Sequence, residues 1–155
     1  MEFDEKAYNE LIEGLFARVK SFQTDGKAAY KPGLDRMMMA ASLMGNPQRS
    51  YKTVHVAGTN GKGSVSNMLA VSLAAKGLRV GLYTSPHLVD FRERMRILEL
   101  PPTRELPGGG IQTLISENEV MELLGQWDET FRNLEMSFFE ITTALAFKWF
   151  ADRKV

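Results

Sequence analysis

The sequence contains no cysteine. Disulfide bonds, thiolate metal ligands and cysteine nucleophiles are therefore excluded, which is compatible with a reducing compartment. An excess of either charge is also missing, since 19 lysines and arginines balance 19 aspartates and glutamates. Without a net positive field, nothing draws the chain to nucleic acid or to an anionic membrane surface. We expect neither partner, so any bound anion must be held by a local site.

Long apolar runs are missing too. No segment approaches the roughly 18 consecutive apolar residues that a membrane-spanning helix requires. The chain begins Met1-Glu2-Phe3-Asp4-Glu5, which is acidic where a secretory signal would be basic and then apolar. These features predict a cytoplasmic protein. With 44% hydrophobic and 25% charged residues in a chain of 155, the composition is that of one ordinary globular domain.

Apolar residues recur at helical spacing in several segments. The stripes predict four helices, in residues 3–20, in residues 34–44, in residues 116–131, and from residue 137 almost to the end of the sequence. The third helix is expected to begin with a capping box, because Ser116 and Glu119 have its spacing.

The middle of the sequence carries a different pattern. Residues 53–57 form a β-branched apolar run, followed by glycines, a helical pattern and a second apolar run at 78–83. This order predicts a βαβ unit with two parallel strands. A hairpin is predicted between residues 95–98 and 111–115, around a loop rich in proline and glycine at 101–110. We therefore predict an α/β fold with a parallel sheet flanked by helices, which binds ligands at the carboxyl ends of its strands.

Two parallel strands make a poor sheet, and another strand normally follows the last helix of such a fold. We therefore expect the domain to be incomplete at its C-terminal end.

The most informative segment lies between the first predicted strand and the helix after it, and reads Gly58-Thr59-Asn60-Gly61-Lys62-Gly63-Ser64. At such a junction, backbone N–H groups and the positive end of a helix converge on phosphate oxygens. Lys62 adds a charge suited to the β- and γ-phosphates of a nucleotide. The segment departs from GxxxxGK[ST], because Gly63 follows the lysine and has no hydroxyl for a magnesium ion. A glycine-rich turn with an exposed lysine is the less favoured alternative.

Together with Val54-His55-Val56-Ala57 before it, this loop resembles the signature of the folylpolyglutamate and dihydrofolate synthases, relatives of the Mur ligases. Gly63 favours this folate branch, because Mur ligases usually carry a hydroxyl residue there. Further blocks resemble the family in the same order along the chain: Gly45-Asn46-Pro47-Gln48, Tyr83-Thr84-Ser85-Pro86-His87-Leu88, Phe91-Arg92-Glu93-Arg94 and Ser137-Phe138-Phe139-Glu140.

The resemblance implies an ATP-dependent ligase that joins L-glutamate to the carboxylate of a folate or dihydropteroate through an acyl phosphate. Residues 58–64 would bind ATP, with Lys62 as the catalytic cation on the phosphates. Ser85 and Glu140 would bind Mg²⁺ through hard oxygen atoms. The candidates for the pterin side of the folate site are Pro86, His87 and Phe91.

The implied architecture is the ATPase domain of the Mur ligase type. Residues 1–155 would be its N-terminal part, without the C-terminal domain that binds glutamate. We therefore expect little or no ligase activity from residues 1–155 by themselves. We also expect a monomer.

Plainer interpretations of several residues stay open. Glu140 lies three residues after Ser137, so it could be merely the capping-box partner of the last helix. Ser85 and Pro86 could form an ordinary turn, and His87 could be a surface histidine. The phosphate loop would serve a P-loop kinase or another nucleoside-triphosphate hydrolase equally well. A nucleotide-binding remnant without turnover is the non-enzymatic alternative.

Overall fold

The computed structural model describes residues 4–18, 33–99 and 111–155. The chain divides into two compact units. The first unit comprises residues 1–47 and 116–148, and the second comprises residues 48–115 and 149–155. The loop predicted at 101–110 lies outside the described residues.

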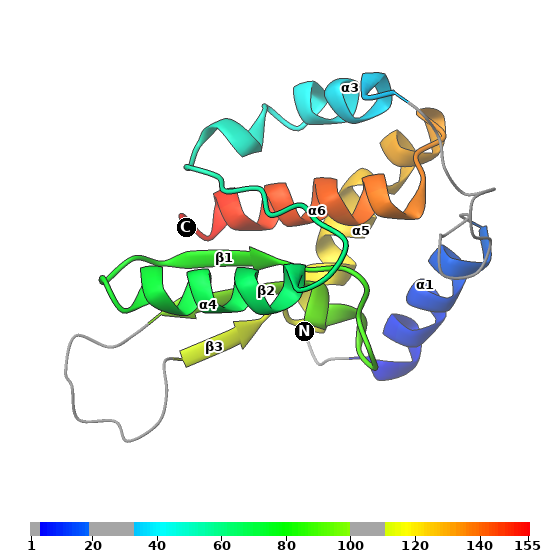
Figure 1. Cartoon of the computed structure of the whole chain (residues 1–155). Helices are drawn as coiled ribbons and strands as arrows, with labels where there is room; N and C mark the ends of the chain where they lie inside the picture. Colours follow the sequence, from blue (N-terminus) through cyan, green and yellow to red (C-terminus); the bar gives the residue numbers. More distant parts are fainter. Residues whose placement is uncertain (1–3, 19–32, 100–110) are drawn as a thin grey trace. The chain divides into compact units, whose positions relative to one another are not determined.

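The first unit is helical and confirms the four helices predicted from apolar spacing (Figure 1). Its helices are α1 (Glu5–Arg18), α3 (Asp35–Leu43), α5 (Glu117–Asn133) and α6 (Phe138–Asp152), whose last residues belong to the second unit. The apolar stripes form the buried core of this unit, which includes Leu15, Val120, Leu124, Phe131, Ile141 and Leu145. The rings of Phe16 and Phe138 stack with their centroids 4.6 Å apart.

Two helices of this unit begin with the same hydrogen-bonded box. At α5, Ser116 N donates to Glu119 Oε2 at 2.9 Å, and Glu119 N donates back to Ser116 Oγ at 3.3 Å. At α6, Ser137 N donates to Glu140 Oε2 at 2.7 Å, and Glu140 N donates to Ser137 Oγ at 3.3 Å. Each box satisfies backbone N–H groups that a helix start would otherwise leave without acceptors, so both helices start where the sequence predicted.

The second unit contains one helix and a three-stranded sheet. Helix α4 (Lys62–Ala74) is followed by β1 (Val80–Tyr83), the 3₁₀ helix η3 (Phe91–Arg94), β2 (Met95–Glu99) and β3 (Ile111–Leu114). The sheet has the order β1-β2-β3, and both pairings are antiparallel. Figure 1 shows α4 running alongside β1. Four residues form the buried contact between helix and sheet: Ala70, Ala74, Leu82 and Leu98.

The sheet confirms one sequence prediction and corrects another. The hairpin of β2 and β3 is present, with Arg96 opposite Leu114. The predicted strand at 53–57 is not: residues 52–58 have no regular secondary structure, and Val54 is 68% exposed. A parallel strand of this kind needs hydrogen-bonded neighbours and cover on both faces, and the described residues pair no strand with this segment. The α/β class stands, but the βαβ unit with two paired parallel strands is wrong.

Gly81 of β1 lies where a ring packs directly against the strand. A Cβ added to Gly81 would lie 2.7 Å from Cδ1 of Phe150 and 2.8 Å from its Cγ. Gly81→Ala is therefore expected to lower the free energy of unfolding by about 1–3 kcal/mol through overpacking. Urea or thermal unfolding of the purified chain measures this change.

Gly125 of α5 provides the matched control, because an added Cβ there meets no atom within 4 Å. Gly125→Ala should stabilise the chain by about 0.5–1 kcal/mol, since alanine loses less conformational entropy in a helix than glycine. Equal effects of the two substitutions would contradict the packing argument.

Candidate functional site

The glycine-rich loop leads directly into α4. Gly58 and Gly61 have φ angles of +154° and +77°, which glycine adopts more readily than other residues. Gly61 is the N-cap residue of α4, and it has no side chain to accept hydrogen bonds from the first turn. The N–H groups of residues 62–64 therefore lack acceptors within the helix and point outward with the positive end of its dipole. This is the arrangement that attracts phosphate.

Lys62 lies across this loop in the structure. Its Nζ donates to the carbonyl oxygens of Gly58 and Thr59 at 2.6 and 3.0 Å. The side chain is exposed, and an added Cβ on the neighbouring Gly63 would meet nothing within 4 Å. A phosphate that binds here would thus meet open space beside Gly63. The ammonium group of Lys62 could bind it by giving up its two hydrogen bonds to carbonyl oxygens.

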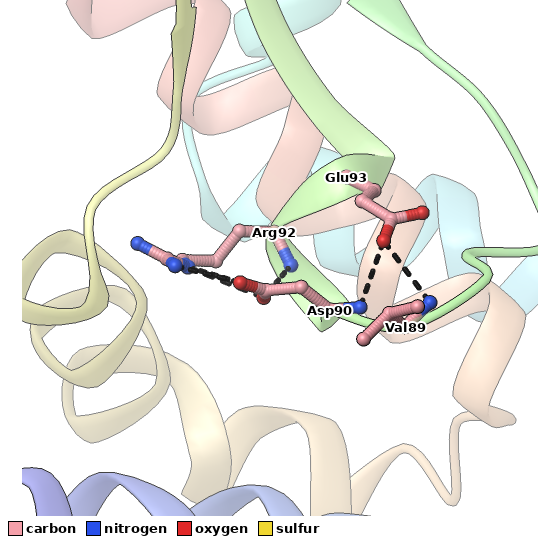
Figure 2. Close-up of polar contacts among 4 residues, drawn as sticks. All are labelled: Val89, Asp90, Arg92 and Glu93. Carbon is pink, nitrogen blue, oxygen red and sulfur yellow. Dashed lines mark hydrogen bonds and ion pairs between the residues drawn. The ribbon is translucent and has the colours of Figure 1, made fainter.

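The loop between β1 and β2 is held from within by Glu93. Its carboxylate accepts from Leu88 N at 2.8 Å, from Val89 N at 3.0 Å and from Asp90 N at 2.8 Å. Figure 2 shows this carboxylate facing the backbone nitrogens of Val89 and Asp90. These backbone hydrogen bonds, that of Asp90 first, lower the pKa of the Glu93 carboxyl. One ionised side chain therefore orders three consecutive residues of the loop.

Asp90 and Arg92 form a second contact in the same loop (Figure 2). Asp90 Oδ1 accepts from Arg92 N at 2.9 Å, and Asp90 Oδ2 accepts from Arg92 Nη2 at 2.6 Å. The hydrogen bond from the Arg92 side chain is the main cause that lowers the pKa of Asp90. Asp90 and Glu93 also form the capping box of η3, so the loop ends in a defined turn.

Arg94 brings two of the predicted site residues together. It is 2% exposed, and its Nε and Nη1 donate to His87 Nδ1 at 2.7 Å and to Ser85 Oγ at 2.8 Å. Burial, and next the charge of Arg94, lower the pKa of His87. Sequence reasoning placed Arg94 in a family block but did not select it as a site residue. The available signal was an arginine directly before the buried strand β2.

The other residues predicted for the pterin side differ in exposure. Pro86 is exposed and follows a cis peptide bond with Ser85. Phe91 is only 4% exposed, and its ring meets that of His87 edge-on with centroids 6.3 Å apart. Leu88 and Val89, which were not predicted, are 89% and 90% exposed. Phe91 thus lies beneath the loop, whereas Leu88 and Val89 form its apolar tip.

Glu140 belongs to the first unit, whereas Ser85 belongs to the second. Besides its box with Ser137, Glu140 pairs with Arg36, whose Nη2 lies 3.1 Å from Oε1. Burial acts to raise the pKa of Glu140, but the hydrogen bonds from Ser137 and Arg36 outweigh it and lower the pKa. The capping role left open by the sequence is confirmed, and the metal role stays a prediction.

Nowhere in residues 4–18, 33–99 and 111–155 do three histidine, aspartate or glutamate side chains gather as a metal centre. No helix in the same ranges has the length and apolar character needed to cross a membrane.

No protein-family model matches the sequence. A probable bifunctional folylpolyglutamate synthase/dihydropteroate synthase of Haloferax volcanii is 34% identical over 148 residues, which are 94% of this chain and 16% of the relative. The crystal structure of folylpolyglutamate synthase from Thermotoga maritima matches 96% of this chain and 31% of its own, with 39% identity and a TM-score of 0.75. Mycobacterium tuberculosis folylpolyglutamate synthase complexed with ADP matches 98% of this chain and 31% of its own, with 32% identity and a TM-score of 0.76.

These matches place the chain in the class of synthases with the Mur ligase fold. Within that class, the chain is similar to folylpolyglutamate and dihydrofolate synthases, the family that the sequence blocks resemble. The chain spans between 16% and 31% of the length of the relatives described above.

Glu93 can be tested as the organiser of the loop between β1 and β2. Glutamine has one carbonyl oxygen where the carboxylate accepts hydrogen bonds at both oxygens. Glu93→Gln is therefore expected to accelerate amide hydrogen exchange severalfold at Leu88, Val89 and Asp90, with little change in β2. Glu122→Gln, at an exposed glutamate of α5, is the control and should leave these amides unchanged.

The pH dependence of the same amides gives an independent test. The pKa of Glu93 lies below its ordinary value of 4.5, because the charged form accepts backbone hydrogen bonds. Protection should persist at all pH values above 4.5 and disappear as the pH falls through the lowered pKa. Asp90 is shifted in the same direction. Loss of protection above the ordinary pKa, with β2 still protected, would contradict this role.

Proposed function

We propose that this chain is the ATP-binding part of a ligase that joins L-glutamate to the carboxylate of a folate or dihydropteroate. The observation that carries the proposal is the glycine-rich loop at the start of α4, with Lys62 held across it. The name of the Haloferax relative and the ADP complex of the Mycobacterium relative support the same assignment.

Nucleotide binding begins at the helix start. The N–H groups of residues 62–64 bind phosphate oxygens, and Gly63 lets the phosphates come close to the backbone. Lys62 leaves the carbonyl oxygens of Gly58 and Thr59 for the β- and γ-phosphates. There its charge offsets the negative charge of the transferred phosphoryl group. The loop thus acts through position and charge.

The chemical step follows from the low reactivity of a carboxylate at neutral pH. The folate-type carboxylate attacks the γ-phosphate, ADP leaves, and an acyl phosphate forms. The amine of glutamate then displaces phosphate from the acyl carbon and gives an amide. Phosphoryl transfer requires mainly alignment and charge neutralisation from the protein, which residues 58–64 provide.

Magnesium fits the predicted donor atoms in kind, because a hydroxyl and a carboxylate are hard oxygen ligands. Ser85 Oγ accepts one hydrogen bond from Arg94 and keeps a second lone pair. Glu140 would supply the carboxylate, which now pairs with Arg36 and accepts from Ser137. When bound, the ion neutralises phosphate charge.

The folate side of the site is assigned to the loop between β1 and β2. Pro86 and His87 stay as predicted, and we add the exposed apolar tip of Leu88 and Val89. An apolar tip held by Glu93 suits the flat, aromatic pterin group. The absence of cysteine and the balanced charge support a cytoplasmic location.

Lys62→Met tests the nucleotide site. The substitution keeps the length of the side chain but removes its charge, so affinity for ATP or ADP should fall by about tenfold or more, equivalent to 1.4 kcal/mol. Isothermal titration calorimetry on the folded variant measures this change. Lys76→Met is the control, because Lys76 lies in the turn after the other end of α4. Unchanged affinity in the Lys62 variant would refute the site.

A pair of substitutions separates the two roles of Glu140. Ser137→Ala removes a partner of the capping box but keeps the carboxylate, whereas Glu140→Gln removes the charge. Both should destabilise α6 by about 0.5–2 kcal/mol. Only Glu140→Gln should raise the magnesium concentration needed for nucleotide binding. If neither variant, or both equally, changes this concentration, the carboxylate serves the helix cap alone.

A further inference from the structure

We propose that Arg94 is a positioning residue, whose guanidinium fixes the Ser85 hydroxyl and the His87 imidazole in one relative orientation. The ligand that these two side chains bind is the one given by the proposed function, so that part of the inference rests on it. The orientation itself rests on contacts within the second unit.

The burial of Arg94 is the first argument. Arginine is almost never fully buried unless it is paired, because removing its charge from water is costly. Arg94 is 2% exposed, and its partners include a neutral imidazole nitrogen at 2.7 Å and a hydroxyl oxygen at 2.8 Å, besides Tyr83. Neutral acceptors compensate a buried charge less well than a carboxylate does. Two of the hydrogen bonds that this buried charge makes therefore go to side chains assigned to the site.

The anchoring of Arg94 is the second argument. It is the last residue of η3, directly before β2. Its carbonyl oxygen accepts from Thr84 N at 3.0 Å, next to Ser85. The backbone of Arg94 is thus tied to the sheet, while its side chain reaches back to the loop. A side chain held by a regular element positions its partners more precisely than the loop alone would.

The hydrogen-bonding chemistry of Arg94 determines the states in which His87 and Ser85 are held. Arginine only donates hydrogen bonds, so Nδ1 of His87 must be unprotonated and its ring hydrogen lies on Nε2. Ser85 Oγ accepts from Arg94, so its second lone pair and its hydrogen remain for another partner. The guanidinium is planar and rigid, which sets both acceptors relative to one plane. A lysine cannot reproduce this, because its ammonium group is a compact point charge on a flexible stem.

Nitrogen NMR of the unmodified 155-residue chain tests the contact directly. We expect a scalar coupling across the hydrogen bond between Arg94 Nε and His87 Nδ1, and the chemical shifts of an Nε2–H tautomer. The chain has two histidines, and the exposed His55 serves as an internal reference. Absence of both the coupling and the fixed tautomer would overturn the proposal without any substitution.

Variants then test whether Arg94 is the cause. Arg94→Met and Arg94→Lys should both release His87 to a mixture of tautomers. Arg96→Met is the matched control, because Arg96 lies two residues further on and donates to Thr84 Oγ1 at 3.2 Å. It should leave the His87 signals in place. A fixed tautomer in the folded Arg94→Met variant, or an equal loss in the Arg96 variant, would overturn the role of Arg94.

A double-mutant cycle connects the orientation to the site. The affinity for ADP with magnesium is measured in Arg94→Met, Ser85→Ala and the double variant. If Arg94 acts through Ser85, affinity falls severalfold in each single variant and no further in the double variant. Additive losses would show that Arg94 does not act through Ser85 and would overturn the positioning role.

The proposed function and the role of Arg94 can be refuted separately. Intact His87 signals with nucleotide affinity that does not depend on Lys62 would refute the proposed function and still support the orientation by Arg94. Affinity that depends on Lys62, with His87 signals indifferent to Arg94→Met, would support the function and overturn the role of Arg94.

Discussion

Two adjacent side chains, Glu93 and Arg94, hold the loop between β1 and β2. The Glu93 carboxylate accepts three consecutive backbone N–H groups, and the Arg94 guanidinium donates to Ser85 and His87. One residue therefore orders the tip of the loop and the other orders its start. Because this pair directly precedes β2, the loop residues assigned to the substrate side are anchored to the sheet.

The phosphate loop depends on a different and more local constraint. Its shape comes from the positive φ angles at Gly58 and Gly61 and from the start of α4. Residues that lie close together in the sequence determine these features, so the sequence predicts them well. The same holds for the capping boxes of α5 and α6, where a serine and a glutamate three residues later suffice. Local hydrogen bonding made these elements predictable.

Features that depend on distant residues were harder to predict. The segment 53–57 has the composition of a buried strand, but a strand also requires partners, and among the described residues β1 pairs with β2 in an antiparallel arrangement. The contacts of Arg94 depend on the path of the loop from Ser85 to Glu93, which composition does not specify. Glu140 is a third feature that depends on a distant residue. Its carboxylate takes part in the helix cap and also pairs with Arg36.

The missing strand has a consequence for nucleotide binding. A glycine-rich loop framed by a strand on one side and a helix on the other has both ends fixed before the ligand arrives. Here α4 fixes one end, while residues 52–58 have no regular structure. Ordering a segment on binding subtracts from affinity. If nucleotide binding fixes this segment in place, that cost is subtracted from the affinity that the start of α4 and Lys62 would supply, and a partner that pairs with residues 53–57 should strengthen binding without touching the phosphates.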